Sequence, residues 1–535
     1  MVGKQTALFP PRKIEEFVKD IQFLTEEIQE LYCADEIPWI IGYSGGKDST
    51  AILQLIWNAI AKLPPEKRHK TIHVITTDTL VENPIVSVKI KKSHQYIKAS
   101  AEKQNMPFTP HILYPDFKET FWVCLMGKGY PAPRIGFRWC TDRMKIQPVN
   151  HFIRKVIRAF GEVIVTLGTR KAESFTRAKT MEKYAKGRYR DRLNNHTSFP
   201  NSYIYTPIED WQTSEVWMYL MQWENPWGYS NKDLFAMYQG ATEDNECPLV
   251  IDTSTPSCGD SRFGCWVCTM VKKDKSMEAM IQNDEEKEWL QPLLDIRNEL
   301  DIQDDRSKRD FRRIWGKVQL FERNIGKGET NIEPIPGPYT KEAREYWLRK
   351  ILEAEEQIKE NAPEDMKDIT LITQEELCEI RRIWLEEKHE FDDSLPRIYE
   401  EVKKEKFYDP RLENQTVLLG KEEWNILEEI CEDNMHLELM AKLLDTERQF
   451  FIKSRRSGII KELEKCFDTS SRNKQDAIDN AHEKRDLKEA VKNSDFKEIK
   501  RIINGEKSTQ EKIQQPTFGM LKFPVLDDND KEKLD

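Results

Sequence analysis

Residues 44–50 read Ser-Gly-Gly-Lys-Asp-Ser-Thr and directly follow the apolar run WIIGY, which is typical of a buried strand. Two adjacent glycines leave backbone N–H groups open to an anion, and Lys47 adds a positive charge. The pattern is not a Walker A loop, because Asp48 follows the lysine. These residues predict a phosphate-binding loop, whereas a plain glycine turn before a helix is the alternative. The candidate phosphate ligands are Ser44, Gly45, Gly46, Lys47, Asp48, Ser49 and Thr50.

A second group of reactive residues consists of cysteines. Cys265 and Cys268 form a CxxC pair, Cys258 precedes the pair by seven residues, and Cys140 lies far upstream. Four such thiolates are a reasonable ligand set for a [4Fe–4S] cluster. Zinc uses the same residues, and ordinary loop cysteines are a further alternative. Cys247 could replace Cys258 as a ligand or act as a free thiol that carries sulfur.

These residues need a scaffold, and the first 220 residues alternate apolar runs with amphipathic stretches. This alternation predicts an α/β fold with a doubly wound parallel sheet, whose ligand lies beyond the carboxyl ends of the strands. The expected strands are 39–43, 72–76, 110–114, 163–167 and 203–205. The expected helices are 50–62, 84–104, 149–160 and 211–223.

The rest of the chain is organised differently. Helical and strand periods fade in the cysteine-rich part, and a charged helical region follows. Thr373 and Glu376 form a possible capping box in that region. The predicted division is 1–233 for the nucleotide domain, 234–275 for the iron–sulfur segment, 276–467 for a helical partner-docking region and 468–535 for a charged flexible tail.

Composition restricts the function classes. The 535 residues carry a net charge of −10, which argues against autonomous tight binding to nucleic acid. No apolar run reaches the ~18 residues of a membrane span, and the first residues lack the apolar core of a signal peptide. We therefore expect a cytoplasmic protein with reduced cysteines.

One stretch departs from the acidic average. Residues 170–192 contain nine Lys or Arg against three acids and follow an expected strand, so they could contact nucleic-acid phosphates near the glycine loop. A solvated surface loop is the alternative. The basic residues are Arg170, Lys171, Arg177, Lys179, Lys183, Lys186, Arg188, Arg190 and Arg192.

Several motifs together resemble the phosphoadenosine-phosphosulfate reductase superfamily, and SGGKDS resembles the PP-loop of ATP pyrophosphatases. The resemblance implies catalytic roles for Lys47, Asp48 and Arg170, and nucleotide contacts from Asp78, Arg170 and Glu173. It also supports joining Cys140 to the downstream CxxC in a [4Fe–4S] cluster. The matching segments are SGGKDST, TTDTLVENP, RWCTDRMKIQP, GTRKAESFTRA and PIEDWQTSEVWMYL.

The chain departs from sulfonucleotide reductases, because the Glu-Cys-Gly motif with a following Leu-His pair is missing and Cys466 lies in EKCFDT. The segment CGDSRFGCWVCTMV and the long helical extension are instead similar to the DndC family of DNA phosphorothioation. That similarity implies ATP, Mg²⁺ and a [4Fe–4S] cluster as cofactors. It also implies DNA, a cysteine desulfurase, an SMC-like ATPase and a small DNA-binding subunit as partners. A sulfonucleotide reductase, a tRNA thiolation enzyme and a non-enzymatic iron–sulfur scaffold are the rival readings.

Overall fold

A computed structural model describes most of the chain. Cys247, Cys258, Lys186, Arg188 and Arg190 lie outside the described residues. The chain divides into two compact units, residues 1–316 with 336–471 and residues 317–335 with 472–535. The described residues are 12–185, 192–196, 198–241, 264–326, 329–410, 421–431, 433–451, 453, 455–470, 472–493 and 501–502.

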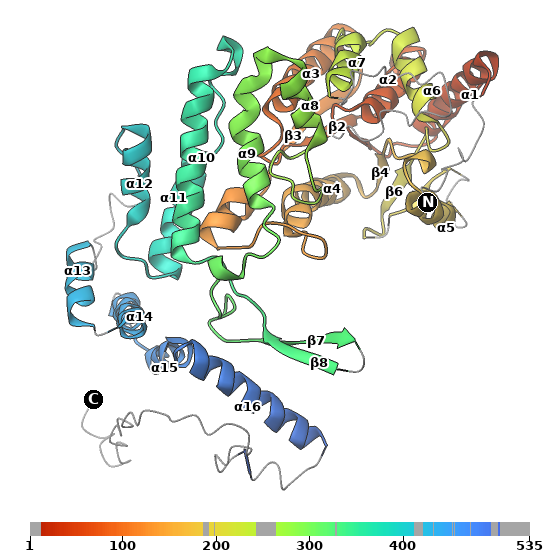
Figure 1. The fold of residues 1–535 in the computed structure, drawn as a ribbon. Helices are drawn as coiled ribbons and strands as arrows, with labels where there is room; N and C mark the ends of the chain where they lie inside the picture. Colours follow the sequence, from red (N-terminus) through yellow and green to blue (C-terminus); the bar gives the residue numbers. More distant parts are fainter. Residues whose placement is uncertain are drawn as a thin grey trace. The chain divides into compact units, whose positions relative to one another are not determined.

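The first unit is built on a six-stranded sheet in the order β3-β2-β1-β4-β6-β5 (Figure 1). All neighbours are parallel except β5, which runs antiparallel to β6. This confirms the predicted α/β fold with a mostly parallel sheet. The strands are β1 (Trp39–Gly42), β2 (Ile72–Thr77), β3 (Phe108–Leu113), β4 (Val163–Thr166), β5 (Asn194–Asn195) and β6 (Ser202–Tyr205).

Helices cover both faces of this sheet. Successive side chains of a strand point to opposite faces, so Trp39 and Ile41 enter one core while Ile40 enters another. The first core contains residues of α1, α2, α3, α6 and α7, and the second contains residues of α4. These helices are α1 (Ile14–Cys33), α2 (Lys47–Ala61), α3 (Pro84–Lys103), α4 (Gln147–Phe160), α6 (Thr213–Gln222) and α7 (Asn231–Gly240), with α5 (Phe175–Ala185) following β4.

The expected strands and helices of this region are present, with shifted ends. Helix α2 begins at Lys47 rather than at residue 50, because Gly46 takes the extended N-cap conformation and the next residues already form the first turn. Helix α1 was not among the expected elements. It packs along α2 through an apolar stripe that includes Phe17, Leu24 and Ile28.

The helical region packs around the segment that carries Cys140. The indole N–H of Trp122 donates to the Leu371 carbonyl at 2.8 Å, and that of Trp384 donates to the Met126 carbonyl at 2.8 Å. The capping box of Thr373 and Glu376 is present. The helices are α8 (Lys275–Asn283), α9 (Gln291–Leu300), α10 (Lys341–Asn361), α11 (Gln374–Arg382), α12 (Ser394–Lys403), α13 (Lys421–Ile430), α14 (Asn434–Phe451) and α15 (Ile459–Ser470), and π-helical turns occupy Val123–Gly127, Thr141–Ile146 and Ile383–Glu387.

The second unit contains an antiparallel hairpin and a helix. Strands β7 (Leu320–Gly326) and β8 (Glu329–Pro334) pair with a register shift between Asn324 and Gly326. Helix α16 spans Lys474–Lys492. Within the described ranges, none of the helices combines the length and the apolar composition that crossing a bilayer requires.

A buried histidine makes the stability of the first unit pH-dependent. The His94 side chain is 6% exposed, and its Nε2 donates to Thr76 Oγ1 at 2.7 Å, while that hydroxyl donates to the Tyr43 carbonyl. Burial lowers the pKa of His94 from 6.5 to about 4. The unfolded chain therefore binds an extra proton between these pH values, so stability is complete above pH 6.5 and falls as the pH approaches 4.

We expect His94→Asn to remove part of this dependence. Between pH 7 and pH 4 the free energy of unfolding of the wild type should fall by about 3 kcal/mol more than that of the variant. Urea unfolding followed by circular dichroism at several pH values measures the difference. Parallel pH profiles for the two proteins would contradict the assignment.

Candidate functional site

The glycine loop lies between β1 and α2, at the carboxyl edge of the sheet. Gly45 has a φ of +71°, which favours glycine, and an added Cβ would lie 3.0 Å from Ile90 Cγ1. Gly46 is the N-cap of α2, so the N–H groups of the next residues lack partners within the helix. Loop and helix together provide the backbone donors and the positive helix end that a phosphate requires.

The hydroxyl of Ser49 closes this loop. Its Oγ accepts from the backbone N–H of Ser44 at 3.2 Å and donates to the carbonyl of Gly46 at 3.0 Å. The Oγ of Ser44 lies 3.1 Å away. Thr50 is buried one residue further along the first turn. In this structure Ser49 thus maintains the shape of the loop through contacts within it.

Arg170 holds the loop in place through a buried contact with Asp48. Its side chain is 2% exposed, and Nε donates to Asp48 Oδ1 at 2.7 Å. The same guanidinium donates to the Trp211 carbonyl at 3.0 Å and to Thr213 Oγ1 at 3.4 Å. Lys47 Nζ lies 3.3 Å from the other carboxylate oxygen of Asp48. The carboxylate is therefore fixed between two cations, and Arg170 acts on the loop through Asp48.

Tyr238 of α7 lies over the start of α2. Its hydroxyl is 3.5 Å from the backbone N of Lys47 and accepts from it, and the Lys47 ammonium lies 5.3 Å from the ring centroid. A Cβ on Gly46 would be 3.2 Å from that hydroxyl. Sequence reasoning did not identify Tyr238, since nothing in the local pattern of α7 connects it to a loop 191 residues away.

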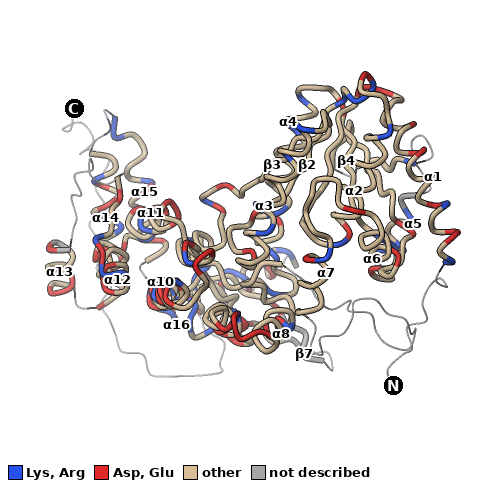
Figure 2. The backbone as a smooth tube through the Cα atoms, turned by 90° about the horizontal axis from the view of Figure 1, so that it is seen from above, with Lys and Arg blue, Asp and Glu red and all other residues tan. Residues whose placement is uncertain are grey.

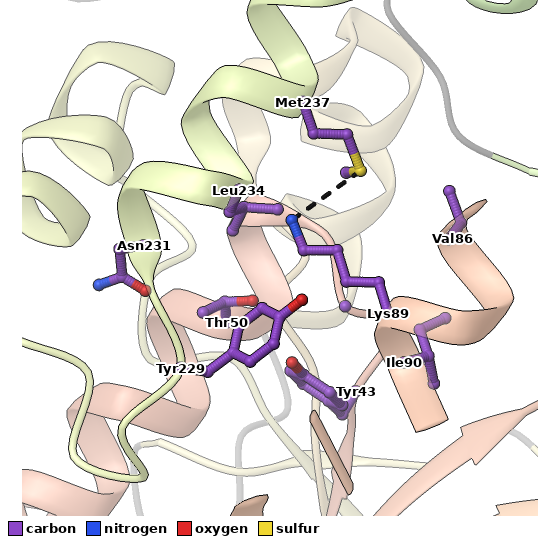
Figure 3. Close-up of a pocket in the computed structure, with 10 residues that line it drawn as sticks. Tyr43, Thr50, Val86, Lys89, Ile90, Tyr229, Asn231, Leu234 and Met237 are labelled. Atoms are coloured by element: carbon purple, nitrogen blue, oxygen red, sulfur yellow. Dashed lines mark hydrogen bonds between the residues drawn. The ribbon is translucent and has the colours of Figure 1, made fainter. Parts of the chain in front are cut away.

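A pocket adjoins the loop between α2, α3 and α7 (Figure 3). Lys89 reaches into it, with Nζ 3.9 Å from Met237 Sδ and 5.6 Å from the ring centroid of Tyr229. Burial lowers the pKa of Lys89 to about 8. The walls beside the glycine loop are aromatic and aliphatic, and the free space is about 10 Å³, close to the room that one water molecule needs. The pocket is lined by Tyr43, Gly45, Thr50, Val86, Lys89, Ile90, Tyr229, Asn231, Leu234 and Met237.

The segment after β2 connects the loop with the cysteines. Asp78 follows the strand beside β1 and accepts from the backbone N–H of Leu80 at 2.9 Å, while Lys91 Nζ lies 3.8 Å from its carboxylate. The next residue, Thr79, has its hydroxyl 3.3 Å from Cys265 Sγ. The carboxylate of Asp78 and the hydroxyl that contacts Cys265 therefore belong to consecutive residues at the carboxyl edge of the sheet, where the glycine loop lies and which we call the phosphate edge.

Cys265 is held by backbone pairing to this segment. The N–H of Trp266 donates to the Val81 carbonyl at 2.9 Å, and that of Asn83 donates to the Gly264 carbonyl at 3.3 Å. The Cys265 thiol donates to Glu82 Oε1 at 3.5 Å. Burial, with a contribution from Glu82, raises the pKa of this thiol to about 12.

The three described cysteines of the predicted set lie near one another. Burial raises the pKa of Cys140, and the charge of Cys268 adds to this effect and also acts on Cys265. Lys145 Nζ lies 3.5 Å from Glu82 Oε1; burial alone would lower its pKa, but Cys265 and Glu82 raise it. Among the described residues, no three His, Cys, Asp or Glu side chains are close enough to hold one metal ion.

Several cations of the predicted basic run are neutralised. Lys171 pairs with Glu209 and Asp210, Arg177 pairs with Glu173, and Arg192 pairs with Glu27 and Glu30. Glu173 Oε1 also accepts from the backbone N–H of Arg170 at 2.8 Å. The paired residues have less charge to offer an external phosphate than the sequence suggested.

A close backbone approach generates a test of the loop. A Cβ on Gly168 would lie 3.0 Å from the backbone C and O of Asp48, so Gly168→Ala must displace the start of α2. We expect the free energy of unfolding to fall by about 1–3 kcal/mol and the ATP binding that the sequence predicts to weaken at least about tenfold. Calorimetric titration and urea unfolding measure these effects.

The matched control is Gly240→Ala at the end of α7, where the added methyl group meets open space. This variant should retain the wild-type affinity and stability. Equal behaviour of the two variants would show that the packing of Gly168 on Asp48 does not control the loop.

Comparisons with known proteins give one family match for this region. Residues 38–228 match the model of the phosphoadenosine phosphosulfate reductase domain. Two uncharacterized proteins of Methanocaldococcus jannaschii are similar. One is 27% identical over 202 residues, which cover 37% of this chain and 35% of the relative, and the other is 26% identical over 178 residues, which cover 33% and 34%. The chain thus spans about a third of the length of these relatives.

Among solved structures, a phosphoadenylyl-sulfate reductase of Candida auris in complex with phosphate aligns at 15% identity. The alignment covers 40% of this chain and 88% of that chain, with a TM-score of 0.26. The family match coincides with the sheet, the glycine loop and Arg170. Over residues 38–228 the chain is therefore similar to the phosphoadenosine phosphosulfate reductase domain.

Proposed function

We propose that this chain uses ATP to adenylate an oxyanion and that the activated group then accepts sulfur. The observation that carries the proposal is the segment Asp78–Asn83, which starts at the phosphate edge and pairs with the CxxC segment through Val81 and Asn83. Phosphate-binding and thiol groups therefore share one region. A simple phosphatase would not require this arrangement.

In the first step the oxyanion attacks the α-phosphorus of ATP. A new phosphorus–oxygen bond forms, the bond to the oxygen that bridges the α- and β-phosphorus breaks, and pyrophosphate leaves with the electron pair. The N–H groups at the start of α2 and the ammonium of Lys47 would stabilise the charge that develops on pyrophosphate. One well-placed donor commonly contributes about 3 kcal/mol to such a step.

Asp48 and Arg170 have positioning roles in this scheme. Because Arg170 is buried and bonded to Asp48, Trp211 and Thr213, it fixes the carboxylate that in turn holds Lys47. Removing the guanidinium would leave a carboxylate without its buried partner and would release the loop.

The donor set fits Mg²⁺ bound together with ATP. Such an ion takes most of its ligands from phosphates and water, so Asp78 and Asp48 suffice as protein carboxylates. When bound, Mg²⁺ would neutralise phosphate charge. Asp48 already faces Lys47 and Arg170, whereas Asp78 has Lys91 3.8 Å away, and Asp78 is therefore the more available ligand.

The cysteines fit an iron–sulfur cluster in ligand type. Cys268 lies near enough to Cys140 and to Cys265 to raise the pKa of each, and the remaining candidates, Cys247 and Cys258, lie outside the described residues. Thiolates are the usual ligands of [4Fe–4S], which would supply a thiolate-bound iron centre beside the phosphate edge. In the present arrangement Lys145 and Glu82 flank Cys265 and can balance charge at that position.

We further propose that the oxyanion is a phosphate of the DNA backbone, as the similarity to the DndC family implies. Sulfur then attacks the DNA phosphorus, a phosphorus–sulfur bond forms, and AMP leaves with the adenylated oxygen. If the sulfur arrives as a cysteine persulfide, its outer sulfur becomes bonded to the DNA phosphorus. A second thiol must then attack the inner sulfur; the sulfur–sulfur bond breaks, the phosphorothioate is released, and the two cysteines form a disulfide. A cysteine desulfurase would supply the persulfide, and the SMC-like ATPase and small DNA-binding subunit would present the DNA.

The reaction predicts pyrophosphate release that depends on DNA. Purified protein with ATP, Mg²⁺, duplex DNA and the partner proteins should release pyrophosphate, and Lys47→Met should lower the rate by about 10²–10³-fold. A coupled phosphate assay measures the rate. The domain match keeps a sulfonucleotide reductase as the second candidate, so the same protein should also receive phosphoadenosine phosphosulfate and a thiol. Sulfite without pyrophosphate would favour the reductase and overturn our proposal.

The cysteine set predicts metal content. After anaerobic purification, Cys140→Ser, Cys265→Ser and Cys268→Ser should each lose iron, sulfide and absorption near 400 nm, because a thiolate ligand is removed. Cys33→Ser is the matched control, since Cys33 is exposed on α1. Bound zinc in place of iron would exclude the cluster, and wild-type iron in all three variants would exclude these ligands.

A further inference from the structure

The exposed face of α4 carries a row of basic residues. His151, Arg154, Lys155 and Arg158 follow the spacing i, i+3, i+4, i+7 and are all exposed, while Ile153 and Val156 face the core. The four side chains, with Ala159, line an open hollow. Figure 2 shows the Lys and Arg positions of this helix. At a rise of about 1.5 Å per residue the row extends over roughly 10 Å.

This row lacks the acidic partners that cations on α10 and α12 have. Helix α4 contains no Asp or Glu, and within the described ranges no carboxylate pairs with Arg154, Lys155 or Arg158. On α10 and α12, by contrast, Lys359 pairs with Glu355 and Glu356, and Arg397 with Glu401. In a chain of net charge −10 the row is a local concentration of positive charge. Its linear shape suits a linear polyanion better than a single small anion.

The position of α4 connects the row with the candidate site. The helix leads into the amino end of β4, so it begins at the carboxyl edge of the parallel sheet, where the glycine loop lies. Its first residue follows Cys140 through the π-helical turn Thr141–Ile146. A polyanion that follows the helix therefore reaches the cysteines at one end.

A second feature precedes Cys140. Arg134 and Phe137 exchange backbone hydrogen bonds around a tight turn in which Gly136 has a φ of +86°. Ile135 is 85% exposed and Phe137 is 42% exposed at its tip. The base of the turn is fixed, because Thr269, the neighbour of Cys268, donates its hydroxyl to the Pro133 carbonyl.

Exposed apolar side chains between Arg134 and Arg138 have the composition of a nucleic-acid wedge. Proteins that unstack a base step insert residues such as Phe or Ile while arginines contact the neighbouring phosphates. An isolated apolar tip is costly on a soluble surface. Here two exposed arginines flank the tip, Arg138 and Arg134, and Arg134 lies 3.8 Å from Asp305.

We infer that the α4 row and the Arg134–Arg138 turn form one DNA-binding surface. The row binds the backbone phosphates of duplex DNA, and the turn contacts an adjacent base step, which brings one phosphate to the cysteines. The identity of the polyanion as DNA rests on the proposed function; the surface itself rests on charge, exposure and position. The basic run 170–192, in which several cations are already paired, takes the smaller part of the binding.

Fluorescence anisotropy tests the row. It measures the affinity of the full-length protein for a fluorescein-labelled 20-bp DNA duplex between 50 and 300 mM salt, without ATP. The triple variant Arg154→Gln, Lys155→Gln and Arg158→Gln should lower affinity at least tenfold at 50 mM salt. It should reduce the slope of log affinity against log salt by about 2.7, since three phosphate contacts are lost. The matched control replaces Lys92, Lys98 and Lys103 of α3, which are exposed on the other face of the sheet, by Gln. This variant should bind as the wild type does.

The turn has a different signature. The double variant Ile135→Ser and Phe137→Ser should weaken binding about tenfold and leave the salt slope unchanged, because apolar contacts release no counterions. Circular dichroism melting checks the fold, and single Lys155→Gln and Arg158→Gln variants replace the triple variant if it is unstable.

The proposed DNA-binding surface would be wrong if the α3 and α4 triple variants weakened DNA binding equally. It would also be wrong if the wild type did not bind the duplex at 50 mM salt. Tighter binding of an RNA duplex of the same length would overturn its assignment to DNA. Because the assay contains no ATP, absence of pyrophosphate release would contradict the proposed function without changing this result.

Discussion

Two backbone hydrogen bonds hold the candidate site together. They join Trp266 to Val81 and Asn83 to Gly264, and they fix the CxxC segment against the end of a strand in the sheet. Without them, no backbone pairing would join the CxxC segment to the residues that follow β2. Thr79 contacts Cys265 directly, so the phosphate edge and this thiol lie at a fixed position relative to each other. The helical region bonds to residues 122–126 through Leu371 and Trp384, and Cys140 packs against the core that these parts of the chain share.

Charge is organised differently at the two halves of the site. At the glycine loop, Asp48 lies between Lys47 and Arg170, which leaves an excess positive charge directed at the start of α2. At the cysteines, burial favours the neutral thiol of Cys265, and Lys145 is the nearby cation. The first environment favours a bound anion. The second favours a thiolate only when a positive centre is also present.

The acidic chain also concentrates positive charge outside this site. On α10 and α12, cations pair with neighbouring acids, which leaves little field beyond those surfaces. Helix α4 lacks such acids and starts at the edge of the sheet that binds the nucleotide in our proposal. The net charge of the chain therefore does not predict where a polyanion can bind, because that depends on where the unpaired charges lie.

The sequence by itself determined the parallel α/β fold, the glycine loop and the order of most strands and helices, because these depend on local periodicity and on glycine. The ligand set Cys140, Cys258, Cys265 and Cys268, with Cys247 as the alternative, stays a prediction, because Cys247 and Cys258 lie outside the described residues. Only the tertiary structure decided that Arg170 is a buried partner of Asp48, that Tyr238 covers the loop and that Lys89 enters a pocket, and it paired part of the basic run with acids. These contacts join residues up to 191 positions apart, and no local pattern encodes which distant side chain fills a given space.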